Sequence, residues 1–577
     1  MSDSSHYTPP LTDMAFVMEQ WLNAADDWQR MPAHAALDAD TARMVCEAAG
    51  DFCAGQLAPL NSSGDMQGCT LQDGRVRTPD GFAAAYHDYV EAGWPALACD
   101  ASVGGQGLPG LLDAALNEML ISSNHAWTMY LGILHGAYAC LYTHASEELK
   151  AQYLPHLVRG DWLPTMCLTE PQAGSDLGLL RTQARPDADG SYRISGNKIF
   201  ISGGDQDWTD NIVHLVLARL PDAPPGTKGI SLFLVPKRIP LAGGGFADNA
   251  VYCDGIEKKM GIKGSSTCAM RFEQAQGWLI GQPHRGLAAM FVMMNSARLN
   301  VGLQGLGHAE TAYQLALAYA RERQQMRAVV RPEGSNGSAD PIALHPPVRR
   351  ILWDLRVWTE GMRALGYWCG HVLDLAAQAP EAAERARAQA LAALLTPIIK
   401  SLFTERGFLL ANEALQVFGG YGYVHEYRIE QTVRDARIAM IYEGTNQIQA
   451  LDLLQRKVLA APEGLAPLLE ALRAEAAQPS IHSAALQGWC DVLETTTQAL
   501  AQDALSDAEL PARAAEDYLR LVGFVALAFA WCRAARIATD AFAHKRESAR
   551  YFFDYVLVEA EHWRNRVQAA RHPVAPI

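Results

Sequence analysis

The order of helix-like and strand-like regions along the sequence constrains the fold of this chain more than any single motif does. Apolar residues recur at helical spacing from about 38 to 160 and again from about 285 onward. Between these stretches, short β-prone runs are separated by turn residues such as Pro224-Pro225-Gly226. A helical, then β, then helical order lacks alternating β and α units, so a doubly wound nucleotide-binding fold is disfavoured.

The length of 577 residues exceeds what one hydrophobic core organises, so several domains are expected. We predict an N-terminal extension, a helical domain, an antiparallel β-domain, a helical bundle and a further helical domain, over residues 1–37, 38–160, 161–282, 283–460 and 461–577. Long periodic stretches with few breakers predict bundle helices over residues 285–325, 345–379, 382–418 and 429–439.

Composition excludes several classes of protein. The net charge of −15 disfavours a general nucleic-acid binder, because phosphate neutralisation needs clustered basic residues. The 11 cysteines show no metal-finger spacing, so we expect free thiols in a reducing compartment and no metal site. No signal peptide is visible at the N-terminus, and we expect a cytoplasmic protein. The longest apolar run, Leu521–Cys532, is shorter than the roughly 20 residues of a membrane span, so we expect a buried helix.

Four segments carry more specific signals. Thr165–Leu177 is rich in turns, hydroxyls and backbone donors, and could hold a polar ring edge or a phosphate, although a satisfied turn has the same composition. Gly196–Gly204 offers an aromatic and a hydroxyl on one strand face. Phe418–Tyr423 is a glycine-rich aromatic segment. Ile441–Gln449 places Glu443 in a short loop, where the following glycine permits close backbone approach.

Together and in this order, the four segments resemble the acyl-CoA dehydrogenase family over about residues 40–455. Four further short segments resemble those of the larger members that carry an extra C-terminal domain, such as the 3-methylmercaptopropionyl-CoA dehydrogenases. These segments are residues 178–182, 259–265, 293–298 and 323–327. The block from about 464 to 570 would be the extra domain.

The resemblance implies an α+β acyl-CoA dehydrogenase fold. Its parts are an N-terminal helical domain, a middle β-barrel or sandwich, a C-terminal four-helix bundle and the additional helical domain. FAD would lie between the β-domain and the bundle of a homo-oligomer, a dimer or a tetramer, in which a neighbouring subunit completes the site.

Site residues are carried over position by position. The FAD contacts implied are Met166, Leu168, Thr169, Gly174, Ser175, Phe200, Ile201, Ser202, Arg323, Met326, Gln416, Gly419, Gly420, Thr445 and Gln447. The acyl-CoA contacts implied are Ser175, Asn295, Arg298, Tyr442 and Gly444. Three positions depart from the commoner family pattern: Phe200 replaces Trp, Asn295 replaces an acid, and Arg323–Arg327 differs from the usual bundle motif.

The resemblance makes Glu443 the catalytic base. It would take the α proton of an acyl-CoA thioester while a hydride leaves the β-carbon for the flavin, giving the trans-2-enoyl-CoA of β-oxidation. The backbone N–H of Glu443 and a flavin ribityl hydroxyl would polarise the thioester carbonyl. We expect desolvation to raise the pKa of this carboxyl. Electrons would pass to an electron-transfer flavoprotein.

Three other functions share this fold. An acyl-CoA oxidase would pass its electrons to oxygen. A flavin-bearing DNA-binding relative would have a basic C-terminal domain, whereas acidic residues outnumber basic ones after residue 460 here. A desulfinase-like relative would eliminate a sulfur group, but Glu443 and Arg298 favour ordinary dehydrogenation. A thioether acyl chain and a plain fatty one are equally compatible with the sequence.

Overall fold

The computed structural model describes residues 7–241, 243–334 and 336–574. By compactness the chain forms two units, which are described separately here. The barrel unit consists of residues 52–108 and 124–297, and the bundle unit consists of residues up to 51, 109–123 and 298–577.

The barrel unit is built around a seven-stranded sheet. Its strands are β3 (Trp162–Cys167), β4 (Gln183–Pro186), β5 (Tyr192–Ser202), β6 (Asn211–Arg219), β7 (Ile230–Pro236), β10 (Val251–Ile256) and β11 (Thr267–Ile280). The strand order is β10-β11-β5-β4-β6-β3, and β7 pairs with both β11 and β6. The pairing path therefore closes on itself, as in a barrel.

The prediction that this sheet is antiparallel is wrong for two pairings, because β3 and β4 both pair in parallel with β6, the latter only at Gln183↔Arg219. Most pairs are antiparallel, but β3 runs parallel to β6 from Trp162↔Asn211 to Cys167↔Val216. β3 follows directly on helix α8 (Glu147–Arg159), and 43 residues, including β4 and β5, separate its end from β6. A parallel pair needs such a long connection, and periodicity within a single strand does not reveal the direction of its partner.

The remaining elements of the barrel unit are short helices and small hairpins. The helices are α4 (Ala58–Gln67), α5 (Phe82–Glu91), α7 (Leu134–His144) and α8, and the hairpins pair β1 (Thr70–Gln72) with β2 (Arg75–Arg77) and β8 (Arg238–Pro240) with β9 (Phe246–Asp248). Helices α7 and α8 pack against β3. The barrel core is apolar and includes Ile194, Ile201, Phe233 and Phe272.

Long helices make the centre of the bundle unit. They are α9 (Gly286–Glu322), α10 (Pro346–Gln378) and α11 (Ala382–Phe418), followed by the shorter α12 (Ile429–Ala436) and α13 (Asn446–Leu451). The four helices predicted from periodicity are confirmed to within a few residues at their ends. Helix α6 (Gly110–Thr128) kinks at Asn124, and both α6 and α9 continue from one unit into the other.

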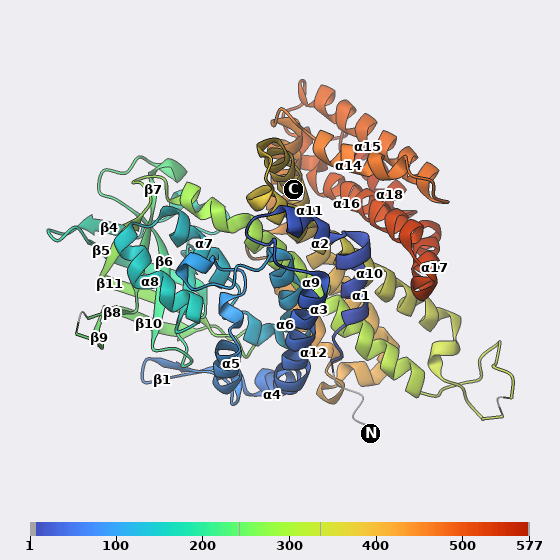
Figure 1. Cartoon of the computed structure of the whole chain (residues 1–577), viewed down its shortest axis with the longest axis horizontal. Coiled ribbons are helices and arrows are strands. Elements are labelled where there is room, and N and C mark those ends of the chain that lie inside the picture. Colours follow the sequence, from blue (N-terminus) through green and yellow to red (C-terminus); the bar gives the residue numbers. More distant parts are fainter. Residues whose placement is uncertain (1–6, 242, 335, 575–577) are drawn as a thin grey trace. The chain divides into compact units, whose positions relative to one another are not determined.

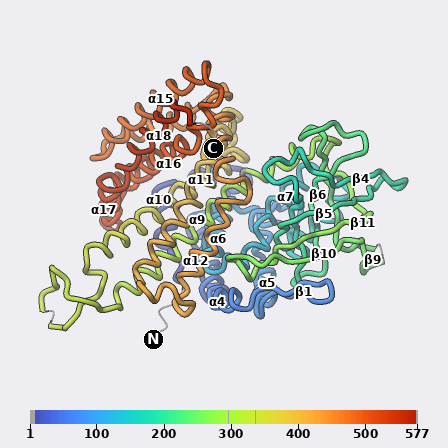
Figure 2. Tube along the Cα trace, turned by 180° about the vertical axis from the view of Figure 1, so that it is seen from behind, coloured from blue at the N-terminus to red at the C-terminus, as the bar shows by residue number. Residues whose placement is uncertain are grey.

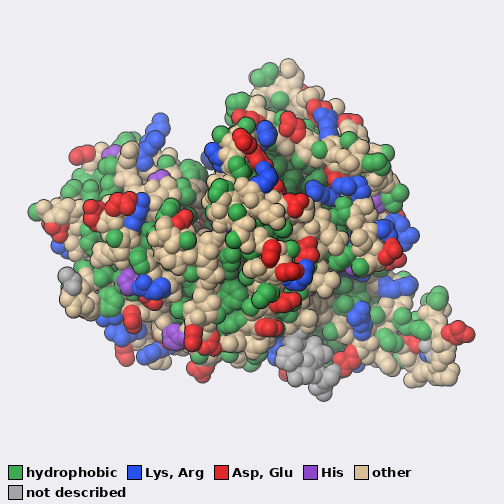
Figure 3. Space-filling view, viewed as in Figure 1, with side chains coloured by type: hydrophobic (Ala, Val, Ile, Leu, Met, Phe, Trp, Pro, Cys, Tyr) green, Lys and Arg blue, Asp and Glu red, His purple; other side chains and the backbone are tan. Residues whose placement is uncertain are grey.

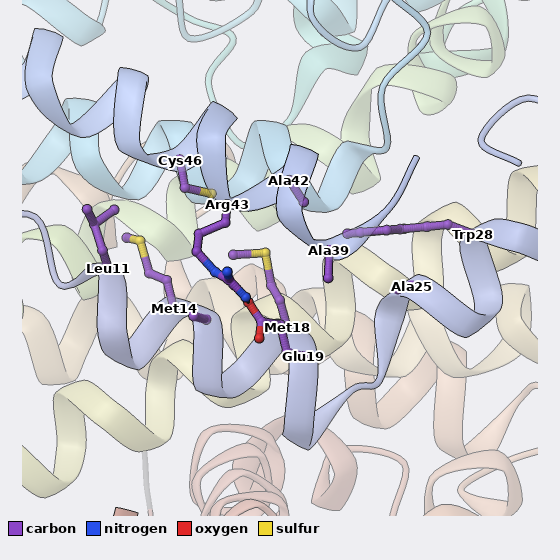
Figure 4. Close-up of a pocket in the computed structure, with 11 residues that line it drawn as sticks. Leu11, Met14, Met18, Glu19, Ala25, Trp28, Ala39, Ala42, Arg43 and Cys46 are labelled. Carbon is purple, nitrogen blue, oxygen red and sulfur yellow. Dashed lines mark hydrogen bonds and ion pairs between the residues drawn. The ribbon is translucent and has the colours of Figure 1, made fainter. Parts of the chain in front are cut away.

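The N-terminal extension, for which no element was predicted, packs into the bundle unit. Helices α1 (Leu11–Ala15) and α2 (Ala24–Arg30) bury Met14 and Trp28 in the bundle unit, the π-helical turn Phe16–Trp21 between them buries Trp21, and α3 (Ala39–Phe52) follows. Figure 4 shows Met14 and Met18 pointing toward α3, where they line a pocket with a cavity of about 20 Å³. That volume has room for about one water molecule, so the pocket is a packing defect rather than a ligand site.

Helices α14 (Ala466–Ala476), α15 (Ser483–Ala504), α16 (Leu510–Ile537), α17 (His544–Tyr551) and α18 (Glu559–Ala569) form the C-terminal block. Within the bundle unit, α16 packs against α10, α11 and α13 (Figure 1). Helix α16 is long and apolar enough to cross a membrane by length and composition, but 89% of its most apolar window is buried in protein, as in a core helix. On the face drawn in Figure 3, acidic and basic side chains are interspersed over this block.

A buried ion cluster joins distant segments of the bundle unit. The guanidinium of Arg363 on α10 is 1% exposed and contacts Glu118 of α6 at 2.6 Å, Glu310 of α9 and Asp13 of α1. Asp13 also accepts a hydrogen bond from Lys545 of α17. Burial opposes ionisation of Asp13, but Lys545 and Arg363 together lower its pKa to about 2.

We predict that Arg363→Met lowers the free energy of unfolding by about 3–5 kcal/mol, because it leaves buried carboxylates without their cation. Urea titration followed by circular dichroism measures this loss. The control is Arg30→Met, which removes an ion pair from a side chain that is 47% exposed and should cost less than about 1 kcal/mol. Equal losses for the two variants would contradict the assigned importance of the buried cluster.

Candidate active site

In the barrel unit, an ion pair fixes the first predicted motif. Glu170 follows β3 and contacts Lys198 of β5 at 2.8 Å, and both side chains are almost fully buried. Glu170 also accepts hydrogen bonds from Arg181 and Thr182, and Lys198 donates to the carbonyl of Leu168. Burial opposes ionisation of Glu170, but Lys198 and these donors lower its pKa to about 2. The motif is therefore held in one conformation.

The predicted flavin contacts of the barrel unit lie at the end of β3, in the turn that follows it, and at the end of β5. Met166, Leu168 and Thr169 are half-buried, whereas Gly174 and Ser175 are exposed in the turn beyond them. The carbonyl of Thr169 accepts a hydrogen bond from the N–H of Ile199 at 2.9 Å. That bond brings the first motif and the end of β5 side by side.

Phe200 is the most unusual residue on β5. Its φ of +60° is rare for a side chain of this size, and its ring is 59% exposed. Ile201 points into the barrel core, so only its main chain could reach a cofactor, and Ser202 is half-buried. A strained backbone that presents an aromatic ring to solvent is the kind of feature that a planar ligand would cover.

In the bundle unit, Glu443 lies in the short loop between the turn Arg437–Met440 and α13. Its φ is +54°, a left-handed conformation that is uncommon outside glycine and occurs at functional sites. The next residue, Gly444, has a φ of +82°, and a Cβ there would come within 2.8 Å of Gln449. The predicted need for glycine beside the carboxylate thus has a geometric reason.

Two cations act on the half-buried Glu443 carboxylate. Desolvation raises its pKa, while the positive charges of Lys400 and Arg298 lower it. Arg298 is 8% exposed, and its Nη1 pairs with Asp452 at 2.7 Å. The Nε of Arg298 is buried and has no hydrogen-bond partner among the described residues. Beside the carboxylate, Tyr442 donates a hydrogen bond to Gln304 at 2.5 Å.

Close packing of α9 on α11 brings these cations to the same place. A Cβ at Gly302 would meet Ile399 at 2.5 Å, and one at Gly305 would meet the carbonyl of Phe403 at 2.0 Å. A Cβ at Gly407 would meet the carbonyl oxygen of Gly305 at 2.3 Å. Because the two helices touch almost backbone to backbone at these glycines, the charged groups on each helix lie close to the Glu443 loop.

The other predicted cofactor residues of the bundle unit are mostly at the surface. The guanidinium carbon of Arg323 lies 5.5 Å from the centre of the Tyr421 ring. Gln416, Gly419, Gly420 and Met326 are exposed, and a Cβ added at either glycine would meet no atom within 4 Å. The loop that follows Arg323 projects from the ends of α9 and α10 (Figure 2). Such open positions are free to contact a ligand or another subunit.

Two predicted cofactor residues have structural partners instead. The Thr445 hydroxyl caps α13 by accepting a hydrogen bond from Ile448 at 3.3 Å. Gln447 donates to Glu516 of α16 at 3.2 Å. Asn295 lies on α9, and its side chain is outside the described residues. The roles of these residues toward ligands stay predictions.

Sequence reasoning missed the groups that hold the site in place: Glu170, Lys198, Lys400 and Asp452. One signal was available for Lys400, because a single lysine in the apolar run Ile398–Phe403 must either reach solvent or find a buried partner. No sequence pattern indicates the partners of the others, which come from distant segments.

Comparison with known proteins covers nearly the whole chain. Family models match an acyl-CoA dehydrogenase N-terminal domain over residues 39–161, a middle domain over 165–275 and a C-terminal domain over 284–458. A model described as acetyl-CoA dehydrogenase C-terminal like matches residues 465–576. The 3-methylmercaptopropionyl-CoA dehydrogenase of Ruegeria pomeroyi is 45% identical over 78% of this chain and 76% of its own length. The chain belongs to the acyl-CoA dehydrogenase family.

One further relative supports this membership, and one solved structure has the same fold. A butyryl-CoA dehydrogenase of Syntrophomonas wolfei is 35% identical over 78% of this chain and 76% of its own length. The structure of a Bacillus anthracis acyl-CoA dehydrogenase complexed with FAD has a TM-score of 0.73 at 22% identity, covering 94% of this chain and 89% of that one.

Family membership confirms the predicted fold, the cofactor FAD and the dehydrogenation of an acyl-CoA thioester. The residues present fit a flavin. The exposed ring of Phe200 supplies a stacking surface, and the turn after β3 is held in one conformation beside it by the bonds of Glu170. When bound, FAD supplies the hydride acceptor.

We predict that Glu170→Gln lowers the amount of FAD that co-purifies, because Lys198 is then buried without its carboxylate and the turn loses its fixed conformation. The ratio of visible flavin absorbance to protein absorbance measures the loss. Asp187→Asn is the control, because it removes a partly exposed ion pair of the same unit, with Arg193 at 2.7 Å. Full flavin content in Glu170→Gln would show that the pair does not organise the site.

Proposed function

We propose that Glu443 is the base that removes the α proton of a short acyl-CoA in the dehydrogenation that this chain catalyses. One observation carries the proposal: a carboxylate in a strained loop has its pKa raised by burial, next to two cations. A carboxylate that works as a base gains from desolvation, because its pKa moves toward that of the proton it removes.

The main chain at this position supports the same role. The N–H of Glu443 donates to no carbonyl or side chain among the described residues. It is therefore free to donate to a thioester oxygen, where negative charge develops as the α proton leaves. Base and donor would belong to one residue, so the loop conformation sets the position of both.

The unpartnered Nε of Arg298 is a further polar group in this site. A buried guanidinium N–H without an acceptor is costly, and a polar atom of the substrate would satisfy it. We assign Arg298 to binding of the CoA part of the substrate, with Tyr442 and Gly444 beside the thioester. Ser175, in the exposed turn of the barrel unit, is assigned to the same ligand.

We infer that the acyl group is short, and 3-methylmercaptopropionyl-CoA is the first candidate. The relative that bears this name is 45% identical to this chain, whereas a relative named butyryl-CoA dehydrogenase is 35% identical. Both names describe acyl groups that are only a few atoms long.

An electron-transfer flavoprotein is the proposed acceptor, and a cytoplasmic homodimer or tetramer is the proposed assembly. The exposed apolar side chains of Met326, Val329, Val330 and Tyr423 support association, because they lie at the open end of the bundle, where Arg323 was predicted to reach the cofactor of a neighbouring subunit. Large apolar side chains that are 77–91% exposed are typical of protein interfaces.

We expect Glu443→Gln to keep its FAD and to lose at least about 10³-fold in kcat, because a positioned base contributes about 10² to 10⁴. Turnover with an artificial electron acceptor measures the effect. Asp354→Asn is the matched control, because burial also raises the pKa of that carboxyl, which accepts a hydrogen bond from Tyr551. Turnover within a few fold of the unmodified enzyme in Glu443→Gln would remove the assignment.

Anaerobic addition of a panel of acyl-CoAs tests the substrate class. We expect the flavin absorbance to bleach fastest with 3-methylmercaptopropionyl-CoA and butyryl-CoA, and more slowly with acyl groups of eight or more carbons. Faster bleaching by the long chains would contradict the short-chain proposal. Re-oxidation by air with stoichiometric peroxide would favour oxygen over a flavoprotein as the acceptor.

A further inference from the structure

Lys400 is a buried cation in the middle of an apolar helix. It lies on α11 with an exposed fraction of 0%, between the buried pairs Ile398-Ile399 and Leu402-Phe403. Its ammonium bonds to neutral oxygens: Nζ donates to the carbonyl of Gly444 at 2.8 Å and to the Oδ1 of Asn446 at 3.0 Å. Burying an ammonium group costs several kcal/mol unless its surroundings compensate, so this placement calls for an explanation.

The partners of Lys400 belong to the loop that carries Glu443. Asn446, the first residue of α13, accepts from Thr404 of α11 at 3.2 Å and donates to the carbonyl of Ser401 at 3.1 Å. From the other side, Gln449 donates to the carbonyl of Glu443 at 3.0 Å. The carbonyls of both residues with positive φ are therefore held, one by Lys400 and one by Gln449.

Holding these carbonyls fixes the loop. Each peptide group is planar, so a hydrogen bond to its oxygen sets the orientation of the whole plane. Without such bonds, the left-handed conformation of Glu443 would relax, because it is disfavoured for a residue with a Cβ. The same bonds therefore maintain the direction of the Glu443 side chain and of its backbone N–H.

We propose that Lys400 is a positioning residue for the dehydrogenation: its ammonium holds the Glu443–Gly444 loop, and its positive charge keeps the Glu443 carboxylate ionised. The inference rests on the proposed role of Glu443 as the base. Lys400 acts through Glu443 and the loop, and it forms no bond to the substrate.

The charged groups around Lys400 come from three elements. Glu443 lies on the loop, Arg298 faces it from α9, and Asp452, just beyond α13, pairs with that arginine. Burial and, to a smaller extent, the charge of Arg298 lower the pKa of Lys400 to about 7, against the attraction of Glu443. Lys400 is thus charged below about pH 7, where the charge matters most to a carboxylate whose pKa burial has raised.

Replacement of Lys400 by Met and by Arg tests the two contributions. Lys400→Met should lower kcat/KM by about 10²-fold, because a misplaced base loses that much. The pH profile of this variant should also change. The acid limb of the profile is the rise of kcat/KM with pH as Glu443 ionises, and it should move to higher pH, because the pKa of the carboxyl is higher once the cation is lost. Lys400→Arg, which keeps a charge, should return the limb toward that of the unmodified enzyme. FAD content and KM should change little.

Gln449→Met perturbs the loop and leaves the charge of Lys400 in place. It should lower kcat without moving the acid limb, and it decides the positioning role if Lys400→Met does not fold. Lys545→Met is the matched control, since it removes another buried lysine, paired with Glu360 at 2.9 Å in the ion cluster. That variant should lose stability and keep the pH profile.

A Lys400→Met enzyme with the rate and acid limb of the unmodified protein would overturn the inference, as would full turnover in Gln449→Met. Loss of turnover in Glu443→Gln with no effect in either of these variants would leave Glu443 as the base and remove only the role of Lys400. Full turnover in Glu443→Gln would remove the proposed function itself.

Discussion

The bundle unit depends on the burial of one guanidinium. Arg363 contacts carboxylates from three other segments, and through Asp13 the cluster reaches Lys545 near the C-terminus. A buried ion that loses a partner is destabilising, so none of these segments can detach at low cost. The N-terminal extension and the C-terminal helices are therefore part of one unit with the bundle, and not appendages to a shorter enzyme.

A rigid frame of this kind is what a strained loop needs. The left-handed conformation of Glu443 costs of order 1–3 kcal/mol and persists only where the surroundings determine it. Helix α11 supplies that support through Lys400 and Ser401, and its position on α9 is set by glycines that allow backbone contact. The precision of the site thus comes from the close packing of the helices that hold the loop.

The sequence predicted much of this arrangement and missed what depends on long-range partners. Helix periodicity placed the bundle helices, and the order of the four motifs predicted the family and the loop of Glu443. Periodicity could not reveal that β3 pairs in parallel, nor that the short helical segments before residue 38 bury Trp21 and Trp28. The pairing of Glu170 with Lys198 was equally hidden, because the two lie 28 positions apart in the sequence.

The two cations beside Glu443 differ in chemistry. Arginine stays protonated at any physiological pH, and here Asp452 neutralises much of its charge. Lysine can lose its proton, and burial has brought the pKa of Lys400 to about 7. The ionised forms of Lys400 and Glu443 therefore stabilise each other, and each loses part of its support when the other is neutralised. A carboxylate beside a cation that is only partly protonated near pH 7 remains more basic than a carboxylate in a strong ion pair. The removal of an α proton requires that basicity.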